Sequence, residues 1–254
     1  PLAASRAGGG PARSVSRQAV TLDAVQALAE ARASWKGADG RPFVTLSYAQ
    51  SLDGSIAAAD GSPLRLSNAD SMTMTHRLRT LHDAILVGIG TLLADDPQLT
   101  VRLAPGDQPQ PVIVDPDLRT PPSARVFRHP RSPWIAVAEP LAAEPASQLR
   151  RAGADLLVVR RDDDGHVDLE DLLRGLAARG IGSLLVEGGS RILHSFLSRR
   201  LVDWVIVTFA PLFVAGIPAL QGNQGRGLPR LDSMGFAASG PDVILWGRPT
   251  WQTA

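Results

Sequence analysis

The sequence has no cysteine among its 254 residues. It therefore has no disulfide, no cysteine-ligated zinc site, no iron–sulfur cluster and no thiolate nucleophile. A zinc-dependent nucleobase deaminase needs a Cys-x-x-Cys pair and is excluded on the same ground. Histidine is also scarce, with 5 residues, and His76 and His82 are six positions apart, which is not one helix face. We therefore expect no metal site.

Lysine is almost absent as well, because Lys36 is the only one. Arginine supplies nearly all of the positive charge, yet the formal net charge is only +1. The pI of about 9.0 reflects the lack of groups that titrate between pH 7 and 9, so it does not indicate a nucleic-acid partner. No apolar run approaches the ~20 residues of a membrane helix, and residues 1–10 carry no secretory signal. We expect a cytoplasmic protein without a membrane partner.

Short apolar runs alternate with helical patterns from Pro42 onward. Continuous apolar runs are typical of strands in a parallel sheet that is covered on both faces. The expected strands are 43–48, 84–89, 111–115, 133–138, 155–160, 183–187, 204–210 and 242–247, and the expected helices are 22–35, 69–81, 144–152, 168–179 and 191–199. This alternation predicts a three-layer α/β fold with a mostly parallel sheet. Because no long helix separates the last two strands, we expect an antiparallel C-terminal edge.

The chain divides by composition into three parts. Residues 1–18 are rich in Gly, Ala, Ser, Pro and Arg, which predicts a disordered N-terminal segment. Residues 19–40 hold the first helix and a glycine-containing linker, and we interpret them as a helical extension. Residues 41–254 then form the single catalytic or binding domain.

The strongest local motif runs from Leu184 to Ser190, where a strand enters the Gly188–Gly189 turn and a helix follows. Free N–H groups at a helix start, together with the helix dipole, favour a phosphate group. The alternative is a plain turn in which Ser190 caps the helix. Glu187 lies at the carboxyl end of the strand, where parallel α/β sheets bind their ligands.

Three further motifs are less specific. Val87–Thr91 is a second strand with a glycine turn, for which a structural role is the simpler interpretation. Asp53–Gly54 follows the first strand, and Asp-Gly is usually a turn signal, although Asp53 is a candidate catalytic carboxylate. Ser67–Asp70 has the Ser-x-x-acid form of a capping box. Arg79 follows three residues after His76, on the same helix face.

Taken together, these motifs resemble the pyrimidine reductases of riboflavin biosynthesis. The resemblance covers four segments in order: 43–102, 111–127, 184–190 and 201–216. It implies a dihydrofolate-reductase-like fold, NADPH as cofactor, a phosphorylated pyrimidine as substrate and a homodimer. Ser47 and the segment 63–67 resemble the stand-alone archaeal and fungal reductases more than the reductase domain of the bifunctional bacterial enzymes. Pro116 stands where some relatives have a serine that contacts the cofactor.

The resemblance also assigns roles to individual residues. The implied cofactor contacts are Ala49, Thr91, Asp95, Gly188, Gly189, Ser190, Arg191, Ile192 and Leu193, within a phosphate-binding loop and helix start that extends to Ser195. The implied substrate contacts are Arg79, Leu99, Arg102 and Glu187, with the arginines suited to the ribose phosphate. Glu187 would orient the pyrimidine, and Asp53 would supply a proton.

The reaction implied by the resemblance converts a ribosylamino side chain to ribitylamino. The substrate is 2,5-diamino-6-ribosylamino-4(3H)-pyrimidinone 5′-phosphate or 5-amino-6-(5-phosphoribosylamino)uracil. Two alternatives stay open: a diverged NADPH-dependent reductase of another pterin-like substrate, and a non-catalytic NADPH-binding relative. No metal takes part in any of them.

Overall fold

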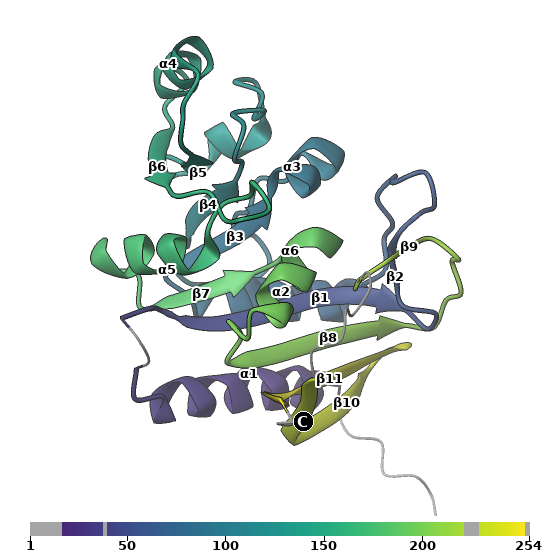
Figure 1. Ribbon diagram of the computed structural model, residues 1–254. Helices are drawn as coiled ribbons and strands as arrows, with labels where there is room; N and C mark the ends of the chain where they lie inside the picture. The colour runs from purple at the N-terminus through teal and green to yellow at the C-terminus, as the bar shows by residue number, and fades with distance from the viewer. Residues whose placement is uncertain (1–16, 38–39, 221–228, 252–254) are drawn as a thin grey trace, which may run out of the picture.

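One large sheet organises the chain (Figure 1). The computed structural model describes residues 17–37, 40–220 and 229–251. Its main sheet has nine strands in the order β10-β11-β8-β1-β7-β3-β4-β5-β6. Every pair from β8 to β6 is parallel, whereas β11 runs antiparallel to β8 and β10 antiparallel to β11. The expected α/β fold with a mostly parallel sheet and an antiparallel C-terminal edge is confirmed.

The elements have the following bounds. The strands are β1 (Phe43–Ser51), β2 (Ser55–Ala57), β3 (Ala84–Gly88), β4 (Gln110–Val114), β5 (Trp134–Ala138), β6 (Asp155–Val159), β7 (Ser183–Val186), β8 (Trp204–Ala210), β9 (Ile217–Pro218), β10 (Pro229–Ser239) and β11 (Asp242–Trp251). The helices are α1 (Arg17–Ser34), α2 (Ala69–Thr80), α3 (Ile89–Asp95), the 3₁₀ turn η1 (Arg125–Arg128), α4 (Ala143–Arg151), α5 (Leu169–Ala178) and α6 (Ser190–Ser198).

Helices cover both faces of the sheet because alternate strand residues point to opposite sides. Val44 and Leu86 lie on the face that α5 and α6 cover, in one buried cluster with Leu172 and Phe196. The opposite face has two separate clusters. One packs α1 and α2 against the strands near the antiparallel edge, and the other packs α3, η1 and α4 against β3, β4 and β5. The result is a three-layer sandwich around buried strands.

Two details depart from the expectations. The strands β2, β9 and β10 and the helix α3 were not expected as regular elements. Helix α2 is capped by Asn68, whose side chain accepts hydrogen bonds from the N–H groups of Asp70 and Ser71, so the proposed Ser67 cap is wrong. The expected disorder of residues 1–18 lies almost wholly outside the described residues. Within the described part of the chain, no helix has both the length and the apolarity needed to cross a bilayer.

A buried histidine ties α2 to the first strand. His82 is 5% exposed, and its Nδ1 lies 2.7 Å from the carbonyl oxygen of Leu78 while its Nε2 lies 2.8 Å from Thr45 Oγ1. The Leu78 carbonyl can only accept, so Nδ1 carries the proton and Nε2 accepts from the threonine hydroxyl. Burial lowers the pKa of His82 from 6.5 to about 4, and the imidazole is neutral in the folded protein at pH 7.

This neutral histidine predicts a loss of stability in mild acid. The unfolded chain binds a proton at His82 below pH 6.5 and the folded chain only near pH 4, so stability falls as the pH drops through this window. We expect His82→Gln to cost stability at pH 7 but to reduce the pH slope by up to ~1.4 kcal/mol per pH unit. Urea unfolding at several pH values measures both.

The matched control is His166→Gln, because the His166 side chain is 54% exposed. It removes the same type of side chain from an exposed position, so the comparison isolates the burial of His82. An identical slope in the wild type and the His82 variant would contradict the assignment.

Candidate functional site

Two glycine turns lie side by side at the carboxyl edge of the sheet. Strands β3 and β7 are parallel neighbours, and each leads through glycine into a helix, α3 or α6. The N–H of Gly189 donates to Thr91 Oγ1 at 2.8 Å and links the two helix starts. A Cβ at position 189 would lie 3.0 Å from that oxygen, and a Cβ at Gly188 would lie 2.7 Å from the Ile192 side chain. Glycine is therefore needed for this close approach.

Helix α6 begins without a side-chain cap. Its N-cap residue is Gly189, its first turn has no acidic residue, and Ser190 is the first helical residue, so the alternative of a Ser190 cap is wrong. The Ser190 hydroxyl is buried and has no hydrogen-bond partner within the described structure. Orphan N–H groups and an orphan hydroxyl at a helix start form a site for an anion such as a pyrophosphate.

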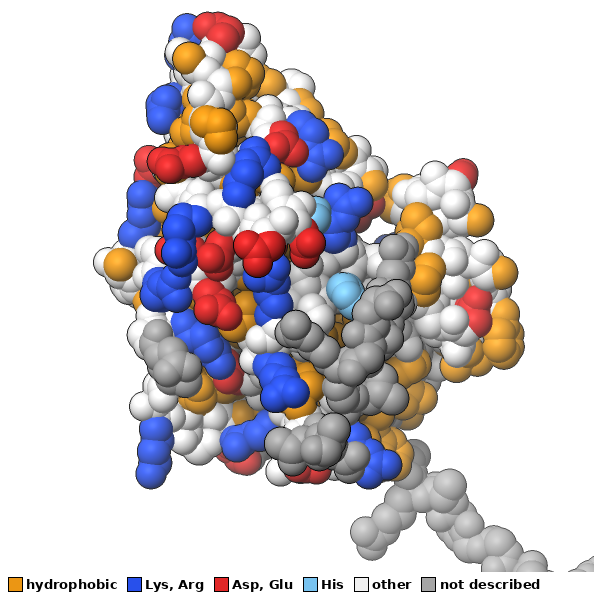
Figure 2. Space-filling model, viewed as in Figure 1, with side chains coloured by type: hydrophobic (Ala, Val, Ile, Leu, Met, Phe, Trp, Pro, Cys, Tyr) orange, Lys and Arg blue, Asp and Glu red, His pale blue; other side chains and the backbone are white. Residues whose placement is uncertain are grey.

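A cleft of about 540 Å³ opens in front of these helix starts. One wall is a small flap in which β2 and β9 pair, and it contributes Ile56, Pro63 and Ile217. The flap rises beside the ends of β1 and β8 in Figure 1, and hydrophobic side chains gather on that side of the molecule in Figure 2. The opposite walls are the turn after β4 and the loop between β6 and α5. A cleft with apolar walls and a few polar groups is typical of a cofactor site.

The cleft contains most of the expected cofactor residues. Those that line it are Thr91, Asp95, Gly189, Ser190, Arg191, Ile192 and Ser195. Ala49 on β1 and Gly188 do not line it. The Leu193 side chain is fully buried in the core, and the Leu193 N–H donates to the Gly189 carbonyl. Neither the side chain nor the N–H is therefore available to the cleft. The sequence patterns did not single out Arg119, Arg199 or the 162–169 loop, which come from distant parts of the chain.

The Asp53 carboxylate holds the flap. It accepts hydrogen bonds from the hydroxyls of Ser51 and Ser55 and from the N–H groups of Val214 and Ala215. The Ser51 hydroxyl and these backbone N–H groups hold the pKa of Asp53 well below its usual range, because each stabilises the charged form. Such a carboxylate is a poor proton donor, and its contacts indicate that it joins the β1–β2 turn to the segment before β9.

Two expected substrate residues pair with each other. Nε and Nη2 of Arg79 donate to the two carboxylate oxygens of Glu187 at 2.8 and 2.7 Å, and Nη1 donates to the carbonyl of Thr100 at 2.8 Å. The side chains are only 11% and 15% exposed. Although burial opposes the charge of Arg79, the Glu187 carboxylate overrides it and raises the Arg79 pKa. Three of the five guanidinium N–H groups are used, which leaves two for a ligand.

Arg102 lies beside this pair on a constrained turn. Its Nη1 donates to Thr100 Oγ1 at 2.6 Å, and its backbone N–H donates to His76 Nδ1 at 2.9 Å. Burial and the neighbouring charges of Arg79 and Arg125 lower the pKa of Arg102, which marks a locally positive region. Leu99 is 2% exposed, and its side chain packs into the core and so anchors the turn. Its backbone is left-handed, with φ at +56°.

His76 is a site residue that the sequence patterns placed only on a helix face. Its Nδ1 accepts from Arg102, so the neutral ring carries its proton on Nε2, which is buried and has no partner within the described residues. Burial, followed by the charges of Arg79 and Arg102, lowers its pKa to about 4. His76 therefore fixes the Arg102 turn as a neutral hydrogen-bond acceptor.

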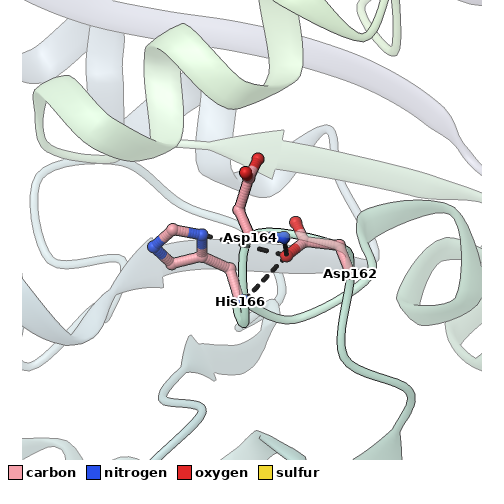
Figure 3. A group of neighbouring side chains, drawn as sticks. All are labelled: Asp162, Asp164 and His166. Atoms are coloured by element: carbon pink, nitrogen blue, oxygen red, sulfur yellow. Dashed lines mark hydrogen bonds and ion pairs between the residues drawn. The ribbon is translucent and has the colours of Figure 1, made fainter.

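Asp162, Asp164 and His166 gather in the loop that borders the cleft (Figure 3). Asp162 accepts from the backbone N–H groups of Asp164 and His166 and pairs with Arg199 at 2.5 Å. The guanidinium already neutralises the one carboxylate of this group that is not exposed. Hydrogen bonds within the loop and the ion pair to Arg199 hold Asp162 in place, and we assign the loop no metal.

Comparison with known proteins agrees with this geometry. The model of the RibD C-terminal domain matches residues 42–245. This chain belongs to the RibD C-terminal domain family. The expectation of a pyrimidine reductase family of riboflavin biosynthesis is confirmed.

Stand-alone reductases are among its similar relatives. The 2,5-diamino-6-ribosylamino-4(3H)-pyrimidinone 5′-phosphate reductase of Methanothermobacter thermautotrophicus is 41% identical over 194 residues, which is 75% of this chain and 88% of that protein. The enzyme of the same name from Debaryomyces hansenii is 37% identical over 68% of this chain and 76% of its own length. The yeast riboflavin biosynthesis reductase Rib7 superposes with a TM-score of 0.73 at 29% identity, over 90% of this chain and all of that one.

The buried ion pair predicts a large effect of single substitutions. Glu187→Gln leaves Arg79 buried without a counter-charge, and we expect a loss of ~3–5 kcal/mol in the free energy of unfolding. Replacing both residues, Arg79→Met with Glu187→Leu, should recover most of that stability because no charge stays buried. Urea unfolding at pH 7 measures both variants.

The comparison variant is Glu144→Gln, which breaks the exposed Arg151–Glu144 pair. It should unfold at the same urea concentration as the wild type. A Glu187→Gln protein as stable as this control would show that the pair carries no structural role.

Proposed function

We propose that the chain is an NADPH-dependent reductase of a ribosylamino-pyrimidine 5′-phosphate in riboflavin biosynthesis. One observation carries the proposal: an uncapped helix start with an orphan hydroxyl lines a cleft, and Glu187, which pairs with Arg79, directly follows the strand that leads into this helix. An anionic cofactor and a second, smaller anion can therefore lie next to each other.

The residues around the helix start fit a dinucleotide. The uncapped N–H groups of α6 and the Ser190 hydroxyl would bind its pyrophosphate, and the close turn at Gly189 gives it room. Thr91 and Asp95 would contact the cofactor from α3. When bound, NADPH supplies a hydride for C1′ of the opened ribosylamino group; the protein aligns the partners and excludes water.

The substrate would lie at the Arg79–Glu187 pair. The positive region around Arg102 suits the ribose phosphate, and the two N–H groups that Arg79 keeps free can join it. Glu187 would then orient both Arg79 and the pyrimidine. Asp53 is not our choice for proton transfer, because its acceptor positions are occupied by the flap.

The test is NADPH oxidation by the purified chain with the diaminopyrimidinone and aminouracil phosphates side by side. The names of the similar stand-alone relatives favour the diaminopyrimidinone. Arg102→Ala should lower kcat/KM for the phosphorylated substrate by ~10- to 100-fold, the range for a charge-assisted hydrogen bond. The effect should be much smaller for the dephosphorylated substrate, because its partner is already missing.

Arg128→Ala is the matched control, since Arg128 is exposed and does not line the cleft. It should leave both substrates unaffected. NADPH binding without turnover of either pyrimidine would favour a non-catalytic relative. If Arg102→Ala lowers kcat/KM equally for the phosphorylated and dephosphorylated substrates, Arg102 does not bind the phosphate.

A homodimer is also part of the proposal, as the family resemblance implies. Strand β10 is an edge of the sheet, and Met234 and Phe236 on it are 54% and 71% exposed, which supports a partner along this edge. Sedimentation equilibrium should give twice the chain mass, and Phe236→Glu should shift it toward the monomer. A wild-type monomer at micromolar concentration would contradict this part.

A further inference from the structure

The loop that carries Arg102 contains no regular structure, yet side chains hold its main chain in place. Residues 96–109 join α3 to β4 and form neither helix nor strand. In such a segment the main-chain N–H and C=O groups have no ladder partners, so they need water or side chains. Here four successive groups, from the Thr100 carbonyl to the Arg102 N–H, are bonded by three side chains. The loop therefore has a defined shape without a ligand.

Gln108 provides two of these hydrogen bonds. Its Oε1 accepts from the Val101 N–H at 2.7 Å, and its Nε2 donates to the Val101 carbonyl at 2.9 Å. A side-chain amide can do this because it carries a donor and an acceptor in one plane. Between these two residues, a Cβ at Gly106 would lie 2.6 Å from Thr80 Cγ2, so the loop packs closely against the end of α2. Gln108 thus holds Val101 as a neighbouring strand would.

Helix α2 provides the other two bonds. Nδ1 of His76 accepts from the Arg102 N–H at 2.9 Å, and the His76 side chain is fully buried. One turn further along, Nη1 of Arg79 donates to the Thr100 carbonyl while its Nε and Nη2 pair with Glu187. The Arg102 side chain is exposed, and among the described residues its guanidinium makes one hydrogen bond, to Thr100 Oγ1. The main chain of Arg102 is therefore fixed while most of its guanidinium is free for a ligand.

We propose that His76 and Gln108 are positioning residues for the substrate: they fix the main chain of residues 100–102 in advance, so that Arg102 meets the substrate phosphate without ordering the loop. This inference rests on the proposed function. Neither side chain has to touch the substrate, because each acts through the main chain. A loop that becomes ordered only on binding weakens the affinity by the entropy that it loses, and a preformed loop avoids that loss. The two residues should therefore set KM for the phosphorylated substrate rather than kcat.

Two readouts on the full chain test the inference. The first is amide hydrogen exchange without substrate, measured by NMR. The Val101 N–H should be protected in the wild type and exchange faster in Gln108→Met, and the Arg102 N–H should do the same in His76→Leu. The second is NADPH oxidation with the pyrimidine phosphate that the wild type reduces. Each variant should raise KM by ~3- to 10-fold, the equivalent of about one hydrogen bond, and leave kcat unchanged.

Three further variants separate positioning from a general loss of structure. His76→Asn should restore most of the wild-type KM, because its Oδ1 can accept in place of Nδ1. In an Arg102→Ala background, His76→Leu and Gln108→Met should raise KM no further, because the side chain that they position is gone. His129→Leu is the matched control, since His129 is also buried and accepts an arginine N–H, that of Arg131, on another loop. It should change neither KM nor the exchange of the two amides.

The inference is overturned if both amides exchange freely in the wild type, if the variants leave KM unchanged or lower kcat instead, or if their losses add to that of Arg102→Ala. Gln108 is only half-buried, so Gln108→Met decides the question even if His76→Leu does not fold. Failure of the wild type to oxidise NADPH with either pyrimidine would instead contradict the proposed function. The exchange data would still decide whether the loop is preformed.

Discussion

Unsatisfied backbone polarity at one edge of the sheet is the constraint on which the candidate site depends. Because β3 and β7 are neighbours, α3 and α6 begin beside each other, and neither has a side-chain cap. The Gly189–Thr91 hydrogen bond satisfies one N–H group and leaves others directed at the cleft. The flap, the arginines and the apolar walls surround this edge, so the free N–H groups and the Ser190 hydroxyl face a cleft that a ligand can enter.

The core strands could be predicted because they are buried on both faces. Runs such as those at Ala84–Gly88 and Trp204–Ala210 are apolar at nearly every position, and their short length and β-branched residues favour strands over helices. Strand β10 was missed because it lies at the sheet edge, alternates weakly and carries an irregularity between Asp232 and Gly235. Helix α3 was missed because it follows β3 directly, with no polar residue to mark its start.

The sequence could name individual candidate residues, but it could not predict which of them pair. The motifs gave Arg79 and Glu187 separate tasks, whereas the fold joins them across 108 positions of sequence. No local pattern carries that information, because the contact depends on β7 inserting between β1 and β3. The same holds for Arg119 and the 162–169 loop, which reach the cleft only through the order of strands β3, β4, β5 and β6.

The turn at Leu99 has a consequence for sequence variation. Its backbone is left-handed, which favours glycine, while its side chain is buried, which favours a large apolar residue. Glycine would relieve the backbone and open a void; valine or isoleucine would fill the void in part and strain the backbone further. Only unbranched or γ-branched apolar residues meet both demands. A randomised library at this position should therefore return very few functional residue types, fewer than at exposed positions.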